Sequence, residues 1–151
     1  EHNRPMFASG SAVVQPYMRE LLREIGQVLA VVPNHLTLEG HTDAQPFSAG
    51  ERGYSNWELS ADRANASRRE LVAGGLPDDR VLRVQGLASS TLFISTEPMN
   101  ASNRRISIIV MNRDAEDRLF RTAPELAQTL VPDAAAVPVS PLTSSLPPVG
   151  R

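Results

Sequence analysis

Two charged side chains, Asp43 and Arg63, stand where the chain passes between regular elements. Asp43 closes the run Gly40–Asp43 at the end of an expected strand, and Arg63 lies in the run Asn56–Ala64, which opens an expected helix. Ligands of sheets with crossover helices tend to bind beyond the carboxyl ends of strands, near helix N-termini, so the two residues can converge on one crevice. The Asp43 carboxylate can accept hydrogen bonds from an ammonium group, and the planar Arg63 guanidinium can donate two parallel hydrogen bonds to a carboxylate. The pair therefore matches a zwitterionic amino-acid head group.

Each of these residues also has a plainer interpretation. Asp43 can simply cap a turn after Thr42, and Arg63 can be a solvated helix charge. His41 is expected to be structural, and Trp57 is expected to pack at the start of the helix rather than to stack on a sugar. The residues alone leave these alternatives open.

Signatures of catalysis are sparse. The chain has no cysteine and three histidines, and it contains no H-E-x-x-H pair, no G-x-S-x-G elbow, no P-loop and no dinucleotide glycine fingerprint. Thiolate metal sites and papain-like catalysis are excluded, and we expect neither a metal nor a cofactor. A carboxylate pair of Asp43 with Glu39 or Asp62 would suggest a hydrolase, but no nucleophile accompanies it.

The charge balance and the hydropathy of the chain limit the classes of partner that it can bind. The 151 residues carry 15 basic and 17 acidic side chains, for a formal net charge of −2, which is a poor balance for nucleic acid. No apolar run approaches the ~20 residues of a membrane helix. The first residues, Glu1–Arg4, show no signal-peptide pattern and no initiator Met. We expect a longer chain with any membrane anchor upstream.

Hydrophobic periodicity predicts one domain over residues 1–122 and a disordered tail rich in Pro, Ala and Ser over 123–151, which can briefly continue a helix at 124–130. A helix is expected over 15–32, with an apolar stripe that contains Tyr17, Leu21, Ile25, Val28 and Val32 and with Met18, Leu22 and Leu29 beside it. The other expected elements are strands at 6–8, 35–41, 81–85 and 105–111, a loop at 42–54, a helix from Asn56 or Ser60 to Ala73, and a short helix at 114–122.

These elements predict an α/β sandwich, in which one mixed sheet of about four strands packs with two or three helices. Strand–helix–strand crossings imply some parallel pairing and right-handed connections. The chain shows no internal repeat.

Five motifs, taken in order, resemble the OmpA-like peptidoglycan-binding domain. They are Leu38–Asp43, Asn56–Ala64, Leu71 with Gly74–Leu76, Arg83–Gly86 and Asn103–Ile106. The resemblance extends over roughly residues 5–112, and the ordered set is far more specific than any single motif. The sequence of residues 53–65 and the longer loop before Asn56 are similar to those of the flagellar-stator branch of this family.

The resemblance implies a ligand, meso-diaminopimelate in the peptide stem of peptidoglycan. By the family pattern, Asp43 takes the free ammonium of that residue and Arg63 pairs with its carboxylate. Thr42, Asn56 and Leu59 line the pocket. The remaining expected site residues are Ser9, in a turn that offers backbone contacts, Asn103 and Arg104, which support the site, and Arg68, which points elsewhere on the helix toward glycan or a partner.

The same resemblance implies a non-catalytic wall anchor in the periplasm, tethered to the inner membrane by an upstream transmembrane segment. It implies a homodimer and a MotA-type stator subunit as partner, and no nucleic acid. Three alternatives stay open: the peptidoglycan anchor of another OmpA-like envelope protein, a wall-acting hydrolase, and a protein-interaction module whose wall site is vestigial.

Overall fold

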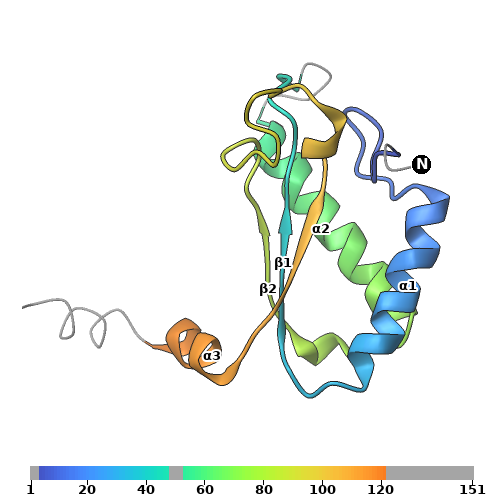
Figure 1. Ribbon diagram of the computed structural model, residues 1–151, viewed down its shortest axis with the longest axis vertical. Helices are drawn as coiled ribbons and strands as arrows, with labels where there is room; N and C mark the ends of the chain where they lie inside the picture. The colour runs from blue at the N-terminus through green and yellow to red at the C-terminus, as the bar shows by residue number, and fades with distance from the viewer. Residues whose placement is uncertain (1–3, 48–52, 122–151) are drawn as a thin grey trace, which may run out of the picture.

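The computed structural model describes residues 4–47 and 53–121 (Figure 1). The predicted tail at 123–151, with its short helix at 124–130, lies outside the described residues. In the described part of the chain, no helix is long and apolar enough to cross a membrane.

The centre of the fold is a three-stranded mixed sheet in the order β2-β1-β3. Strand β1 (Leu36–Gly40) pairs in parallel with β2 (Val81–Gly86) and antiparallel with β3 (Ile106–Val110). The parallel pair is connected through a helix, as parallel strands require, and the predicted mixed α/β sheet is confirmed. Of the strands anticipated, that at 6–8 forms only one bridge, between Phe7 and Val14.

The first strand is interrupted because its chain turns back at once. Gly10 has φ +65°, a left-handed conformation that glycine adopts without strain, and Ser11 donates its backbone N–H to the carbonyl of Ala8. This turn replaces a ladder of strand pairing, and it leaves the carbonyl of Ala8 close to the end of β1, where the site is built.

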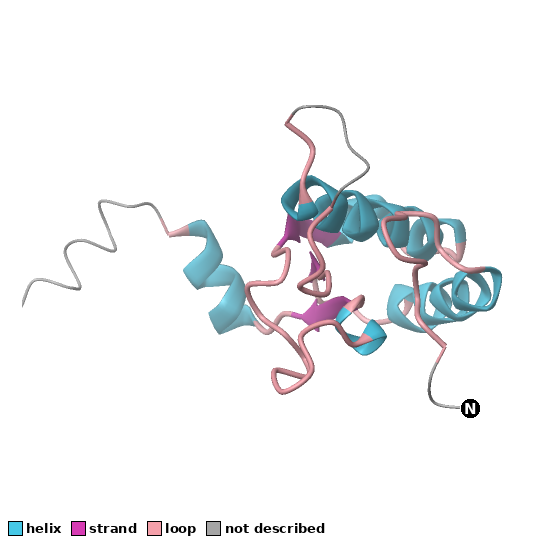
Figure 2. Cartoon of the chain, turned by 90° about the horizontal axis from the view of Figure 1, so that it is seen from above, coloured by secondary structure: helices cyan, strands magenta, loops and turns pink. Residues whose placement is uncertain are grey.

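Two long helices, α1 (Pro16–Ala30) and α2 (Asn56–Ala73), lie side by side along the sheet (Figures 1 and 2). Helix α2 packs on β1 and β2, whereas α1 packs on α2. Glycines allow the close approaches: a Cβ on Gly26 of α1 would lie 2.2 Å from the Leu71 carbonyl oxygen, and one on Gly40 of β1 would lie 1.8 Å from that of Ser60. The core between these layers is aliphatic, with Leu22, Leu36, Leu38, Leu71 and Leu76 buried beside Phe7.

The predicted apolar stripe of α1 is partly wrong: Met18, Leu22 and Leu29, expected beside it, pack on the core, whereas two of its own members do not. Leu22 and Gly26 are the buried residues of this helix, and Ile25 packs against the core, but Leu21 and Val28 are 44% and 66% exposed. Apolar residues occupy a wide arc of α1, so hydrophobicity alone does not identify its contact line. The small residue Gly26 marks it, since a Cβ there would collide with the Leu71 backbone of α2.

The N-terminus of helix α2 is fixed by two reciprocal capping hydrogen bonds. The Ser55 side chain accepts from the backbone of the first turn, and the Glu58 side chain accepts from the Ser55 backbone, a capping box. The helix ends at Gly74 and Gly75, and Gly75 has φ +119°. Helix α2 therefore presents the same residues of its first turns to the end of β1.

The C-terminal helix α3 (Arg113–Phe120) projects on the opposite side of the sheet from α1 (Figure 1). The Asn112 side chain caps it by accepting from Ala115 N–H, and Glu116 reaches the ring of His35, which precedes β1, at 3.0 Å. Two 3-10 turns, Asp78–Arg80 before β2 and Ala101–Asn103 before β3, complete the described elements.

Candidate functional site

A cavity of about 180 Å³ opens where β1 ends and α2 begins, and it contains both residues of the predicted charged pair. Asp43 and Arg63 line it together, although twenty positions separate them in sequence. The other predicted residues that line it are Ser9, Thr42, Asn56 and Leu59, with Gly10 of the expected turn at 7–10; the structure adds Gln45, Pro46 and Phe47, which sequence reasoning missed. The turn-rich composition of the 42–54 loop was the only signal for the last three.

Arg63 is fully buried, so the interpretation as a solvated helix charge is wrong. Its guanidinium donates to three backbone carbonyls: Nη2 to Ala8 at 3.0 Å, Nε to Ser11 at 2.8 Å and Nη1 to His41 at 3.4 Å. The Phe7 ring lies under it, 5.1 Å from the ring centroid to Cζ. These contacts tie the turn at 8–11, the end of β1 and α2 to one cation.

The electrostatics of Arg63 favour an anionic ligand. The pKa of Arg63 is lowered to about 10, chiefly by burial and then by the nearby Arg104, against the opposing effect of Asp43. The guanidinium remains charged at neutral pH, but it has lost water and gained only neutral carbonyls as direct partners. A carboxylate entering the cavity would stabilise this charge.

Asp43 is 5% exposed and already engaged on both carboxylate oxygens. Its Oδ1 accepts from the Gln45 backbone N–H at 3.2 Å, which is the turn-capping role anticipated as an alternative. Its Oδ2 lies 2.8 Å from Nη1 of Arg104, whose Nε also donates to the Phe7 carbonyl. Arg104 therefore contacts the site through Asp43, which agrees with its predicted supporting role.

Asn103, which precedes Arg104, is buried and organises the loop before β3. Its Oδ1 accepts from Ile94 N–H, while its Nδ2 donates to the carbonyls of Ile94, Glu97 and Pro98. The Pro98 carbonyl in turn accepts from Ala44 N–H at 2.9 Å, next to Asp43. Asn103 thus acts on the site through the loop backbone and does not line the cavity.

The remaining walls of the cavity are polar on one side and apolar on the other. Asn56 Nδ2 donates to the Gln45 carbonyl at 2.9 Å and ties the 42–54 loop to α2. Leu59 is buried against the site. Thr42, which lines the cavity, is 1% exposed, and its hydroxyl is a buried group with no hydrogen-bond partner among the described residues.

Three other predictions about single residues have different outcomes. Trp57 is 56% exposed, so the prediction that it packs at the helix start is wrong. His41 is buried, its Nε2 lies 3.2 Å from Ser107 Oγ, and its pKa is lowered, chiefly by burial and then by Arg105, as befits a structural histidine. Arg68 lies outside the cavity and pairs with Asp78.

The carboxylate pair that would suggest a hydrolase is not assembled. Glu39 accepts from Gln85 across the sheet, Asp62 accepts from the Tyr54 hydroxyl, and neither lines the cavity with Asp43. Among residues 4–47 and 53–121, no group of three potential metal-ligating side chains is found. The arrangement around Asp43 and Arg63 is suited to holding a charged ligand.

The chain resembles known proteins over most of its length. The OmpA family model matches residues 6–106. Motility protein B of Escherichia coli (strain K12) is 57% identical over 118 residues, which are 78% of this chain and 38% of that protein. The chain thus spans less than two fifths of this relative.

Solved structures agree with the sequence match. The cell wall anchor of the T6SS from Pseudomonas aeruginosa has a TM-score of 0.59 at 31% identity, covering 72% of this chain and 76% of that one. The periplasmic domain of Helicobacter pylori MotB has a TM-score of 0.61 at 18% identity, covering 85% and 82%, a likeness of fold. Because the family model matches more than half of its residues, the chain belongs to the OmpA family.

Proposed function

We propose that this domain binds peptidoglycan without cleaving it, by holding a diaminopimelate residue of the stem peptide in the Asp43–Arg63 cavity. The observation that supports this most is the buried, charged guanidinium of Arg63, which faces the same cavity as a carboxylate and has only backbone carbonyls as direct partners. A free amino-acid head group supplies both complementary charges at once.

In this proposal the ligand carboxylate binds Arg63, and its ammonium binds Asp43. Asp43 keeps Arg104 on Oδ2, so the ammonium takes a remaining lone pair, as a carboxylate can accept about four hydrogen bonds. The Thr42 hydroxyl, which has no partner among the described residues, donates to the ligand. The backbone turn at Ser9 and Gly10 closes the rim.

The proposed cellular role is that of a wall anchor. We infer a periplasmic location, tethered to the inner membrane by a segment upstream, in a homodimer with a MotA-type stator subunit. The similarity to Motility protein B supports this role. The similarity to a cell wall anchor of the T6SS favours the alternative, in which the same wall-binding domain anchors another envelope complex.

Binding to purified sacculi tests the proposal. We expect the chain to sediment with diaminopimelate-type sacculi and Asp43→Asn to lose most of this binding, whereas Arg68→Gln on the far part of α2 binds like wild type. Stem peptides with lysine instead of diaminopimelate lack the carboxylate for Arg63 and should bind at least tenfold more weakly.

Two results would contradict the proposal. Equal binding of the lysine and diaminopimelate peptides would show that Arg63 does not bind the diaminopimelate carboxylate. Release of soluble muropeptides from the sacculi, abolished in Asp43→Asn, would favour a hydrolase instead.

A further inference from the structure

A second cavity, of about 110 Å³, lies next to the first and is lined by three arginines. Arg4, Arg104 and Arg105 border it together with Met6 and Ser102. None of its lining residues is acidic in the described part of the chain. Like charges gathered around one hollow repel one another and attract an anion, although the chain as a whole has a net charge of −2.

Two of these guanidiniums, those of Arg4 and Arg105, are held in place by contacts that do not neutralise them, whereas Arg104 pairs with Asp43. Arg105 stacks over the Phe93 ring at 5.6 Å and donates through Nη2 to the Thr91 carbonyl. Its Nη1 is buried and has no hydrogen-bond partner among the described residues. Burial lowers the pKa of Arg105, against a smaller opposing effect of Glu39. This guanidinium is therefore partly desolvated without a direct anionic partner that compensates for the lost water.

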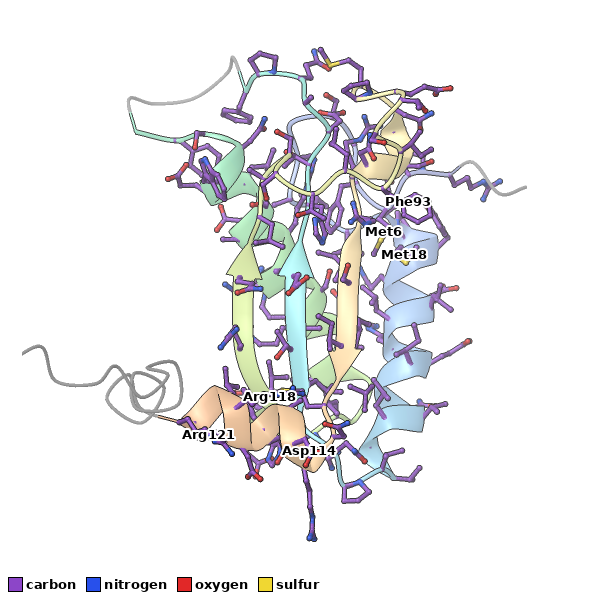
Figure 3. The ribbon with its side chains drawn as sticks, turned by 60° about the vertical axis from the view of Figure 1, so that its left-hand side comes forward. Met6, Met18, Phe93, Asp114, Arg118 and Arg121 are labelled. Carbon is purple, nitrogen blue, oxygen red and sulfur yellow. The ribbon has the colours of Figure 1, made fainter. Side chains whose placement is uncertain are left out.

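Arg4 is oriented by α1. Its guanidinium lies over the Tyr17 ring, 5.8 Å from the centroid, and the Tyr17 hydroxyl donates to the backbone carbonyls of Arg4 and Pro5 at 2.7 Å. Aromatic faces thus position two of the three cations. In Figure 3, Met6 and Phe93 lie toward the same end of the fold, where the N-terminal segment passes the start of β3.

Arg104 connects the two cavities. It lines the second cavity, while its Nη1 contacts Asp43, which lines the first. A ligand in the first cavity therefore has a cationic hollow one side chain away.

We infer that the Arg4–Arg104–Arg105 cavity is a second anion subsite, which takes a carboxylate of the stem-peptide residue next to the bound diaminopimelate. This inference rests on the proposed function. The hollow is small enough for a single anionic group, and its short separation from Asp43 fits a neighbouring residue of the same peptide. The chemical class recognised is a free carboxylate, and its conversion to a neutral amide removes the charge that the arginines attract.

A matched pair of peptides tests the subsite. The tripeptide L-Ala-γ-D-Glu-meso-diaminopimelate is compared with the same tripeptide whose glutamyl α-carboxylate is a primary amide, by calorimetric titration of the full chain at fixed salt. We expect wild type to bind the free acid about three- to tenfold more tightly, which is the range for one partly exposed charge-assisted contact. Arg4→Gln and Arg105→Gln should each reduce this preference while leaving affinity for the amide unchanged.

Arg83→Gln removes the same charge from an exposed position on β2 and should keep the full preference. Equal binding of the two peptides by wild type would overturn the subsite and leave the first cavity intact. A loss of preference in Arg83→Gln as large as that in Arg105→Gln would also overturn it, because the effect would then be general electrostatics. Failure of wild type to bind either peptide would refute the proposed function itself.

Discussion

Replacing Arg63 by methionine should destabilise the fold as well as abolish binding. Methionine keeps much of the side-chain length but removes the guanidinium donor from the carbonyls of Ala8, Ser11 and His41, of which the Ala8 carbonyl keeps the Ser11 N–H. Each buried hydrogen bond to a charged group contributes about 1.5–3 kcal/mol. The burial that lowers the pKa of Arg63 to about 10 offsets part of this sum, because the cost of desolvating the cation disappears with it. We expect a net loss of about 3 kcal/mol in the free energy of unfolding.

The assay is urea denaturation followed by far-UV circular dichroism, with an unchanged dependence of the free energy on urea concentration as evidence of a single transition. Arg68→Met is the matched control, since it makes the same replacement on the same helix at a side chain that pairs with exposed Asp78, and it should cost under about 1 kcal/mol. A loss below about 1 kcal/mol for Arg63→Met would refute the idea that these three carbonyls depend on the guanidinium. The same result would mean that the turn at 8–11 holds without it.

Three further predictions concern the frame of the site. Gly40→Ala should prevent stable folding, since its Cβ would lie 1.8 Å from the Ser60 carbonyl oxygen, and a native-like melting temperature by circular dichroism would contradict the close packing of β1 on α2. Asn103→Ala should cost about 2–3 kcal/mol by removing buried hydrogen bonds, and should speed amide hydrogen exchange at Ile94; protection as in wild type would show that the loop does not need Asn103. The Tyr54 hydroxyl should ionise with a pKa of about 12, raised by burial and by its hydrogen bond to Asp62. Asp62→Asn should lower it in an ultraviolet titration, and the stability that Tyr54 adds relative to Tyr54→Phe should be present below pH 10 and lost as pH rises toward 12.

Much of the fold was predictable because local signals agree with the tertiary structure. The expected helix from Asn56 to Ala73 and the strand expected at 105–111 each correspond to an observed element, α2 and β3. The contact face of α1 was predictable only in part, because its apolar arc is wider than the contact line and includes the exposed Leu21 and Val28 beside the buried Leu22. The strand predicted at 6–8 is reduced to a single bridge because the left-handed turn at Gly10 competes with strand pairing.

The central pair of the site was predictable, but its loop lining and its connectivity were not. Motif spacing indicated that Asp43 and Arg63 share a crevice, and they do. The pairing of Asp43 with Arg104, by contrast, depends on β3 returning beside β1, a contact between residues 61 positions apart. The full burial of Arg63 depends likewise on the turn at 8–11. Long-range contacts of this kind leave no periodic trace in the sequence.

The burial of Arg63 affects binding because folding desolvates and orients the guanidinium before a ligand binds. Folding removes water from the guanidinium and fixes it on three carbonyls, so the cost of desolvating and orienting this cation is met before any ligand arrives. A ligand carboxylate then has to lose only its own water and rotational freedom, and the contact contributes more to affinity than the same pair would on an open surface. Stability and recognition therefore depend on the same side chain, and substitutions at Arg63 cannot separate them. Asp43→Asn keeps the side-chain shape and an acceptor for the Gln45 N–H, but it also removes the ion pair with Arg104, so its cost in stability has to be measured beside its loss of binding.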